Sequence, residues 1–364
     1  MKSTKKARKV AFVLGTRPEI IKLYPVIDEY RKKNYPFIVI HTNQHYDEKM
    51  DRVFFDDLDM PKPDYNLNIG SGAQGDQTGR MIVGIEKVLL KEKPDIVVVQ
   101  GDTNTVLAGA LVASKMGIKV AHVEAGLRSY DRTMPEEINR VLTDCVSNWL
   151  FCPTKLQKDI LIDEGIAEEK IWVTGNTIVD AVKSVVKATK TKSDICERHN
   201  LKKEGYFLMT CHRPSNTDDK RILNNILSGI EQICTKENLK CVFPVHPRLK
   251  NKMKLIQKYQ HIITYDPVSY PDLLKLQKNC QMVFTDSGGI QEESCILHKK
   301  CLILRLNTER PETVEIGGAV LLEKMSSNDI LKKYAVLKEK KVKWTNPFGD
   351  GKAGRKIIQM INNG

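Results

Sequence analysis

Long hydrophobic runs are absent from this chain of 364 residues. Apolar stretches such as residues 96–99 and 106–113 fall far short of the ~20 residues that a membrane-spanning helix needs. The apolar segment at residues 10–14 follows a basic N-terminus but is too short for the core of a signal peptide. We therefore expect no membrane partner and a location in the cytoplasm.

Paired cysteines are also missing. The sequence has nine cysteines, an odd number, and no Cys-x-x-Cys motif. This spacing suits neither a disulfide framework nor a set of zinc ligands. We interpret the cysteines as mostly buried, reduced thiols, and we expect no metal site.

Aromatic residues are scarce, and basic residues outnumber acidic ones. Aromatic side chains make up 6% of the chain, while 58 Lys and Arg against 45 Asp and Glu give a formal net charge of +13. A groove for single-stranded nucleic acid needs aromatic stacking platforms as well as charge, whereas these lysines are scattered and seldom alternate with aromatic residues. We therefore expect no nucleic-acid partner, and we interpret the charge as a lysine-rich surface with a site for an anionic small molecule.

Short apolar segments alternate with helical patterns along the chain. Expected strands lie at residues 10–14, 37–42, 96–100, 120–123, 149–152, 206–211, 241–245, 262–265, 282–286, 301–304 and 319–322. Expected helices lie at residues 18–34, 78–91, 103–116, 136–146, 155–164, 220–234, 249–259, 271–278 and 289–297. Strands that are apolar throughout and alternate with helices indicate parallel sheets covered on both faces.

The length suits two domains at ~100–200 residues each. We predict an α/β fold with two doubly wound, Rossmann-like domains facing a cleft, at residues 1–182 and 205–350, joined by the polar segment 183–204. Ligands of doubly wound sheets bind at the carboxyl ends of the strands, so the functional residues are expected there.

The first such position is Gly15-Thr16-Arg17-Pro18-Glu19, directly after the first expected strand. Glycine permits a tight turn and Pro18 suits the first helical position, which places Arg17 at the carboxyl edge of the sheet. Lys22 lies one turn further along the same side of the helix. An Arg and a Lys at such a crossing favour anion binding over a merely capped helix.

Four ionisable residues stand where further strands end or the following helices begin: Asp102, Glu124, Glu136 and His212. Taken singly, Asp102 could cap a helix and Glu136 could belong to an ordinary helix start. Together, three carboxylates and a histidine on facing edges of a cleft indicate acid–base chemistry.

Two glycine-rich runs have different contexts. Ser287-Gly288-Gly289 joins an expected strand to an expected helix, which predicts a phosphate cradle of backbone N–H groups, although the glycines could simply make a turn. Glu293 falls one turn into that helix, where it could reach sugar hydroxyls, and Arg310 adds positive charge near a further strand end. Gly70-Ser71-Gly72-Ala73-Gln74-Gly75 matches G-x-G-x-x-G but lacks a preceding strand, so we interpret it as a surface loop and expect no nicotinamide cofactor.

Six segments together resemble one family. They are Gly15-Thr16-Arg17-Pro18-Glu19, Gly101-Asp102-Thr103, His122-Val123-Glu124-Ala125-Gly126-Leu127-Arg128, Pro135-Glu136-Glu137, residues 285–293 and Thr308-Glu309-Arg310-Pro311-Glu312. The chain resembles the non-hydrolysing UDP-N-acetylglucosamine 2-epimerases. Its Thr42-Asn43-Gln44-His45-Tyr46 and Gln100-Gly101-Asp102-Thr103-Asn104-Thr105 segments are most similar to those of archaeal members.

The resemblance implies a GT-B fold, with the C-terminal helix at about 351–364 packing back on the first domain and a second domain that binds UDP. It implies reversible conversion of UDP-N-acetylglucosamine to UDP-N-acetylmannosamine, in which UDP is eliminated to give a 2-acetamidoglucal and then re-added. The proton on carbon 2 returns from the opposite face. No cofactor is needed, the partner is the UDP-sugar, and we expect a homodimer.

By the same resemblance, Asp102, Glu124 and Glu136 would move or position protons, and His212 would contact the departing diphosphate. UDP would be held by Arg17, Lys22, Arg140, Ser287, Gly288, Gly289, Glu293 and Arg310. The hydrogen on carbon 2 is barely acidic, so it can leave only while the bond to UDP breaks. The stabilisation must therefore act on the diphosphate.

The chain departs from many bacterial members after His212-Arg213, where they carry Arg or Ala and then Glu and this chain has Pro214-Ser215-Asn216. That segment could touch the sugar or an effector. The alternatives are a sister 2-epimerase of UDP-2,3-diacetamido-2,3-dideoxyglucuronate and, from a different class, a GT-B glycosyltransferase, because a fold alone does not fix a reaction. Hydrolysing relatives that release free N-acetylmannosamine are less favoured.

Overall fold

The computed structural model describes residues 7–44, 55–56 and 58–363. Two compact units make up the chain: Met1–Lys183 with Phe348–Gly364 form unit 1, and Ser184–Pro347 form unit 2. His45 and Tyr46 of the archaeal-type segment lie outside the described residues.

Unit 1 is built on a seven-stranded parallel sheet with the strand order β3-β2-β1-β4-β5-β6-β7. Its strands are β1 (Val10–Leu14), β2 (Phe37–His41), β3 (Tyr65–Asn66), β4 (Ile96–Gln100), β5 (Lys119–Val123), β6 (Trp149–Cys152) and β7 (Ile171–Val173). The chain runs outward from β1 in one direction and from β4 in the other. This reversal between β1 and β4 is a topological switch point, where doubly wound sheets place their ligands.

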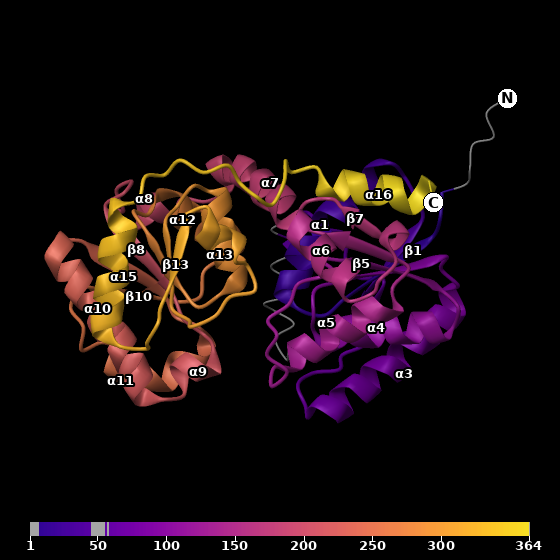
Figure 1. Cartoon of the computed structure of the whole chain (residues 1–364), viewed down its shortest axis with the longest axis horizontal. Coiled ribbons are helices and arrows are strands. Elements are labelled where there is room, and N and C mark those ends of the chain that lie inside the picture. The colour runs from indigo at the N-terminus through magenta and orange to yellow at the C-terminus, as the bar shows by residue number, and fades with distance from the viewer. Residues whose placement is uncertain (1–6, 45–54, 57, 364) are drawn as a thin grey trace. The chain divides into compact units, whose positions relative to one another are not determined.

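Helices cover both faces of this sheet (Figure 1). They are α1 (Arg17–Lys32), α3 (Gln74–Glu92), α4 (Asn104–Lys115), α5 (Pro135–Val146), α6 (Lys155–Asp163), α7 (Thr177–Lys192) and α16 (Ala353–Asn363), with a short 3-10 turn, η1, at Glu168–Lys170. The side chains of α3 and α4 form a buried cluster with β1, β2 and β4.

The C-terminal helix α16 belongs to unit 1 although it follows unit 2 in the chain. It lies against α1, and a Cβ atom on Gly354 would stand only 2.7 Å from the Pro25 carbonyl oxygen of that helix. The Asp180 carboxylate of α7 accepts hydrogen bonds from the N–H groups of Ala353 and Gly354, at 3.2 and 3.0 Å. These contacts cap the start of α16 and hold the helix against α1 and α7 of unit 1.

Unit 2 repeats the pattern with a six-stranded parallel sheet in the order β10-β9-β8-β11-β12-β13. The strands are β8 (Tyr206–Thr210), β9 (Lys240–Pro244), β10 (Ile262–Tyr265), β11 (Val283–Thr285), β12 (Cys301–Ile303) and β13 (Ala319–Leu321). Two buried clusters, one formed with α10 (Lys220–Glu237) and α15 (Ser327–Glu339) and one with α8 (Ile195–Arg198) and α12 (Tyr270–Asn279), cover opposite faces. The remaining helices are α9 (Pro214–Thr217), α11 (Met253–Ile256), α13 (Gly288–Ile296) and α14 (Glu312–Glu315).

The predicted helix at residues 249–259 is wrong. The structure has a 3-10 segment, η2 (Pro247–Lys252), followed by the single helical turn of α11. Leu249, Met253 and Ile256 have helical spacing and suggested one helix, but Lys250 and Lys254 would repel each other at the i and i+4 positions. The sequence also failed to indicate β7 and α15, and β3 precedes the glycine-rich run at residues 70–75, which we expected to lack a preceding strand.

Candidate active site

The predicted site residues divide between the two units. Arg17, Lys22, Asp102, Glu124, Glu136 and Arg140 lie in unit 1, and His212, Ser287, Gly288, Gly289, Glu293 and Arg310 lie in unit 2. In each unit most of them follow the carboxyl ends of the central strands, β1, β4 and β5 in one and β8 and β11 in the other.

Glu124 follows β5 and is buried. The ammonium of Lys22 donates to both of its carboxylate oxygens, at 2.7 and 2.6 Å, and the amide of Gln100 donates to one of them at 2.5 Å. The resemblance assigned Lys22 to UDP and Glu124 to proton transfer, and the structure brings the two side chains into contact. The backbone of Glu124 has a φ of 69°, a left-handed conformation that costs a residue with a side chain about 1 kcal/mol or more and often marks functional sites.

Asp102 follows β4 and does not cap the next helix. Thr103 takes that role, because its hydroxyl accepts from the Val106 N–H at 3.4 Å. The Asp102 carboxylate instead forms an ion pair with Arg140, which also contacts Glu137 at 2.6 Å. The Asp102 side chain remains partly exposed while that of Arg140 is buried, so one carboxylate edge can reach solvent.

Of the paired acids that begin α5, the structure buries Glu137 and leaves Glu136 exposed. The Glu137 carboxylate accepts hydrogen bonds from the N–H groups of Ser129 and Tyr130, both at 2.9 Å. It therefore fixes the loop after β5. Sequence reasoning missed this residue, because two adjacent acids at a helix start look alike before their faces are known.

Glu19 is a further buried carboxyl that the sequence did not single out. It accepts from the Gly15 N–H at 2.5 Å, from the Thr16 N–H at 3.3 Å and from the Thr103 hydroxyl. Burial raises the pKa of Glu19 to about 7, against the opposing effect of these hydrogen bonds. Through these hydrogen bonds, Glu19 links the loop before Arg17 to the loop that carries Asp102.

In unit 2, the imidazole of His212 is held by Asp286 at the end of β11. The His212 Nδ1 atom lies 2.9 Å from the Asp286 carboxylate, which also accepts from the N–H groups of His212 and Arg213 at 3.0 and 2.9 Å. Burial alone would raise the pKa of Asp286, but its hydrogen bond and charge interaction with His212 outweigh it and lower the pKa to about 2. The ionised carboxylate orients the ring, and the other ring nitrogen remains available to a ligand.

Asn216 has a structural role in Pro214-Ser215-Asn216, the segment in which this chain differs from many bacterial members. Its buried amide donates to the Asp286 carboxylate at 3.1 Å and to the Leu304 carbonyl at 2.9 Å. The segment thereby supports the pair formed by His212 and Asp286. Sequence reasoning missed Asp286 because its contact depends on β8 and β11 being neighbours.

The start of α13 lies beside the guanidinium of Arg310. Ser287 is the N-cap of α13, and a Cβ atom on Gly288 would lie 3.3 Å from the Arg310 guanidinium. Arg310 pairs with Glu292 at 3.0 Å and lies 3.5 Å from Glu309. The positive end of the helix therefore stands beside a guanidinium.

Glu309 is shared by several arginines. Arg305 pairs with it at 2.7 Å, Arg310 at 3.5 Å and Arg213 at 3.8 Å. Burial opposes ionisation of Glu309, but these arginines hold its pKa well below the usual range. With Glu292, which also pairs with Arg310, two buried carboxylates stand among these three guanidiniums, so one positive charge is in excess among the five groups. Arg213 was not among the predicted UDP contacts.

Glu293 lies one turn into α13 and is buried. Its carboxylate accepts from the Tyr270 hydroxyl at 3.0 Å and from the Gln277 amide at 2.6 Å. These bonds fix its orientation within unit 2.

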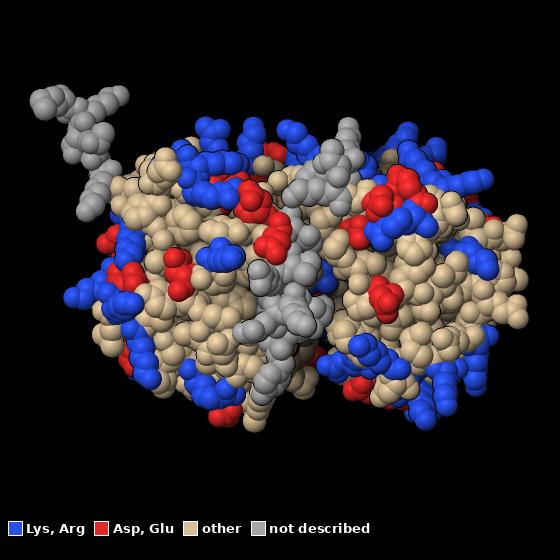
Figure 2. Space-filling model, turned by 180° about the vertical axis from the view of Figure 1, so that it is seen from behind, with Lys and Arg blue, Asp and Glu red and all other residues tan. Residues whose placement is uncertain are grey.

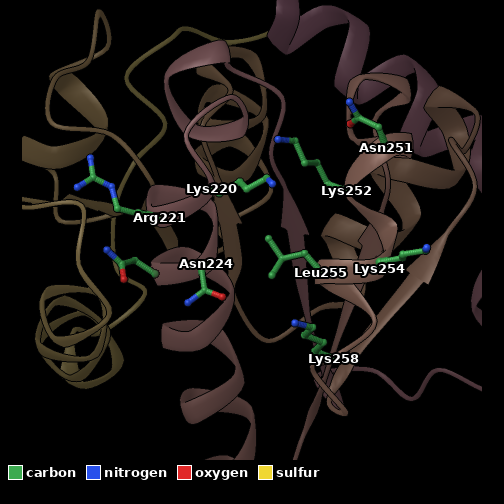
Figure 3. Close-up of a pocket in the computed structure, with 9 residues that line it drawn as sticks. Lys220, Arg221, Asn224, Asn251, Lys252, Lys254, Leu255 and Lys258 are labelled. Carbon is green, nitrogen blue, oxygen red and sulfur yellow. The ribbon is translucent and has the colours of Figure 1, made fainter.

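Lysine and arginine side chains spread over the face shown in Figure 2. Five basic side chains line a groove of 720 Å³ between α10 and the η2–α11 segment (Figure 3): Lys220, Arg221, Lys252, Lys254 and Lys258. The other lining residues are Asn224, Asn225, Asn251 and Leu255, so aromatic side chains and carboxylates do not contribute to this groove.

Within the described ranges, no cluster of three or more His, Cys, Asp or Glu residues could hold a metal ion. Across the same ranges, every helix is too short or too polar to traverse a lipid bilayer. The nine cysteines are free thiols, and all except Cys145 are buried.

Two doubly wound parallel sheets, one in each unit, confirm the predicted α/β fold of the GT-B class. A family model described as UDP-N-acetylglucosamine 2-epimerase matches residues 28–362. The chain belongs to this family.

Two curated relatives carry the same name. UDP-N-acetylglucosamine 2-epimerase of Methanocaldococcus jannaschii is 51% identical over 98% of this chain and 99% of its own length. UDP-N-acetylglucosamine 2-epimerase of Methanococcus maripaludis is 52% identical over 97% of this chain and 98% of its own length. A crystal structure of the M. jannaschii enzyme in complex with UDP-GlcNAc and UDP has a TM-score of 0.91 and 52% identity, covering 98% of this chain and 100% of that one.

Proposed function

We propose that this protein interconverts UDP-N-acetylglucosamine and UDP-N-acetylmannosamine by eliminating UDP and adding it back. Membership of the family and the names of its archaeal relatives support this substrate over the carboxylated sugar of the sister epimerase. The structural observation that supports the proposal is that the two units carry different kinds of polar groups. Unit 1 offers carboxylates set among cations, and unit 2 offers a helix start beside clustered guanidiniums.

Inversion at carbon 2 requires a proton to leave from one face of the sugar and return to the other. Asp102 and Glu124 suit this task because they follow adjacent strands and belong to separate loops. We assign one of them to each face, so that the base of the forward reaction is the acid of the reverse reaction. Glu136, which is exposed at the start of α5, would position the sugar.

Lys22 and Arg140 contact these carboxylates directly. We therefore propose that they orient the carboxylates of Glu124 and Asp102, rather than serving UDP alone. An ion pair made in low dielectric also fixes the carboxylate's direction, which a proton transfer needs.

The departing diphosphate would be bound in unit 2. His212, oriented by Asp286, would donate from its outer ring nitrogen, and the N–H groups of Gly288 and Gly289 would donate to the diphosphate oxygens together with Arg310. Arg17, Ser287 and Glu293 complete the proposed UDP contacts. Stabilising charge on the leaving group is what makes removal of a weakly acidic proton feasible.

A homodimer in the cytoplasm is part of this proposal. Ile138 and Leu142 lie one turn apart on α5 and are 44% and 46% exposed, as an interface with a second copy would require. Nine free thiols suit a reducing compartment. Sedimentation should give the mass of a dimer for the wild-type protein and of a monomer for Leu142→Glu.

Incubation of the pure protein with UDP-N-acetylglucosamine, followed by NMR of the products, tests the function. We expect an equilibrium mixture with UDP-N-acetylmannosamine and no accumulation of free sugar. Release of free N-acetylmannosamine would indicate a hydrolysing enzyme. A substrate left unchanged until an acceptor is added would indicate a glycosyltransferase.

A further inference from the structure

His122 is a fully buried polar residue in the middle of an apolar sheet. It lies on β5, opposite Val99 of β4 and Leu150 of β6, with none of its surface exposed. Burying a polar ring costs roughly 1–3 kcal/mol unless hydrogen bonds replace those made with water. An apolar side chain would suit these neighbours, so the hydrogen bonds of His122 must account for its presence.

One ring nitrogen of His122 holds the loop of Asp102. Nε2 lies 2.8 Å from the carbonyl oxygen of Gly101, the residue directly before Asp102. A carbonyl oxygen only accepts hydrogen bonds, so Nε2 must carry a proton. Gly101 has a φ of 85°, a backbone conformation that glycine adopts readily and that turns the chain sharply at this point.

The other ring nitrogen of His122 is linked through Asp144 to the loop that carries Glu124. Nδ1 lies 2.6 Å from one oxygen of Asp144 on α5. The second oxygen of Asp144 accepts from the Gly126 N–H at 3.2 Å and pairs with Arg128 at 2.8 Å. Gly126 follows Glu124 by two residues and is tightly fitted, since a Cβ atom there would stand 2.6 Å from the Gln157 carbonyl oxygen.

Charges alternate along this network. Arg128, whose side chain is buried, also pairs with Glu164 at 2.5 Å. Asp144 therefore faces a guanidinium on one side and His122 on the other. Asp144 thus has a partner for each carboxylate oxygen, which is the arrangement that makes a buried charge tolerable.

We propose that His122 is a positioning residue: a buried imidazole ring that ties the Gly101–Asp102 loop to the Glu124–Gly126 loop and sets the separation of the two carboxylates. This role rests on the proposed function, because those carboxylates must reach opposite faces of one sugar carbon. His122 itself touches neither substrate nor reacting atoms. A displacement of about 1 Å in a catalytic group can lower the rate on the order of 100-fold, so a fixed separation has a measurable effect.

Three substitutions separate the two arms of the network. His122→Gln keeps a donor near the Nε2 position, His122→Asn keeps one near the Nδ1 position, and His122→Ala keeps neither. We expect kcat to fall on the order of tenfold for Gln and Asn and on the order of 100-fold for Ala, with KM and the affinity for UDP within twofold of wild type. Partial rescue by Gln and Asn relative to Ala is the signature of positioning.

Asp180→Asn is the matched control. It weakens a half-buried acceptor of two backbone N–H groups in unit 1, at the start of α16, away from both loops. It should lower the melting temperature without changing kcat. The proposal is overturned if folded His122→Ala retains kcat within twofold, or if the control loses activity in the same proportion to its loss of stability.

Nitrogen-15 NMR of the histidine rings tests the bridge without any activity measurement. Nε2 of His122 should carry a proton that is hydrogen-bonded to the Gly101 carbonyl oxygen, and an Nε2 without a proton would contradict the bridge even if the variants fail to fold. If the wild-type protein does not epimerise the sugar, the proposed function fails, whereas the NMR result still decides whether His122 links the two loops.

Discussion

Replacing Gly288 with valine tests the proposed diphosphate cradle. The Cβ atom of any larger residue would lie 3.3 Å from Nη1 and 3.4 Å from Cζ of Arg310. These contacts are tighter than ordinary packing, and Arg310 cannot retreat freely because it is buried and bonded to Glu292 at 3.0 Å. Valine would therefore push against the guanidinium and also stand where backbone N–H groups must approach the ligand.

The expected loss of UDP affinity is tenfold or more, equivalent to about 1.4 kcal/mol. Calorimetric titration with UDP measures it directly. Gly289→Ala is an informative partner, because a Cβ atom at that position would meet only the Ser287 hydroxyl at 3.9 Å. Its effect on protein packing should be small, so any loss of affinity would come from the ligand.

Gly79→Ala is the control, since a Cβ atom there meets nothing within 4 Å, in the interior of α3. It should leave UDP affinity unchanged and raise stability by roughly 0.5–1 kcal/mol. A folded Gly288→Val protein with wild-type UDP affinity would refute the assignment of the cradle.

Three further outcomes follow from the site. Asp102→Asn and Glu124→Gln should each lower turnover by about 10²–10⁴ while UDP binding persists, and full activity in both would mean that other carboxylates act. Because burial raises the pKa of Glu19 from 4.5 to about 7, the folded state disfavours its ionised form, and this group's contribution to stability is lost as pH rises from about 4.5 through about 7. Glu19→Gln should reduce this fall in the free energy of unfolding by up to about 3 kcal/mol, as measured by urea titrations at several pH values between about 4.5 and 7. The same pH dependence in the variant and the wild type would contradict the raised pKa of Glu19. Duplex DNA should bind weakly, through surfaces such as the basic groove, and dissociate between about 50 and 200 mM salt, whereas salt-resistant binding in a gel shift would revive the nucleic-acid alternative.

The central strands were predictable because burial on both faces makes them apolar throughout. β1, β4 and β6 match the expected bounds, and all three lie inside the sheet of unit 1. β3 and β7 form the edges of that sheet, and Ile171 is the one buried residue of the two strands, so neither strand is buried throughout.

Contacts between single side chains of the site could not be predicted from the sequence. The sequence indicated which loops carry ionisable groups, but not which groups meet. Asp102 could have capped α4 until Thr103 was seen to do so. The pairing of Lys22 with Glu124 joins residues 102 positions apart, and that of His212 with Asp286 joins residues 74 apart. Such contacts are set by strand order and register, which a local pattern does not contain.

Turnover of UDP-N-acetylglucosamine in heavy water tests the central claim most directly. If one carboxylate removes the proton from carbon 2 and another delivers a solvent-derived one to the opposite face, the UDP-N-acetylmannosamine formed should carry deuterium at carbon 2. The reaction should proceed without added nicotinamide. Product without deuterium, or turnover that depends on added NAD, would contradict elimination and re-addition of UDP.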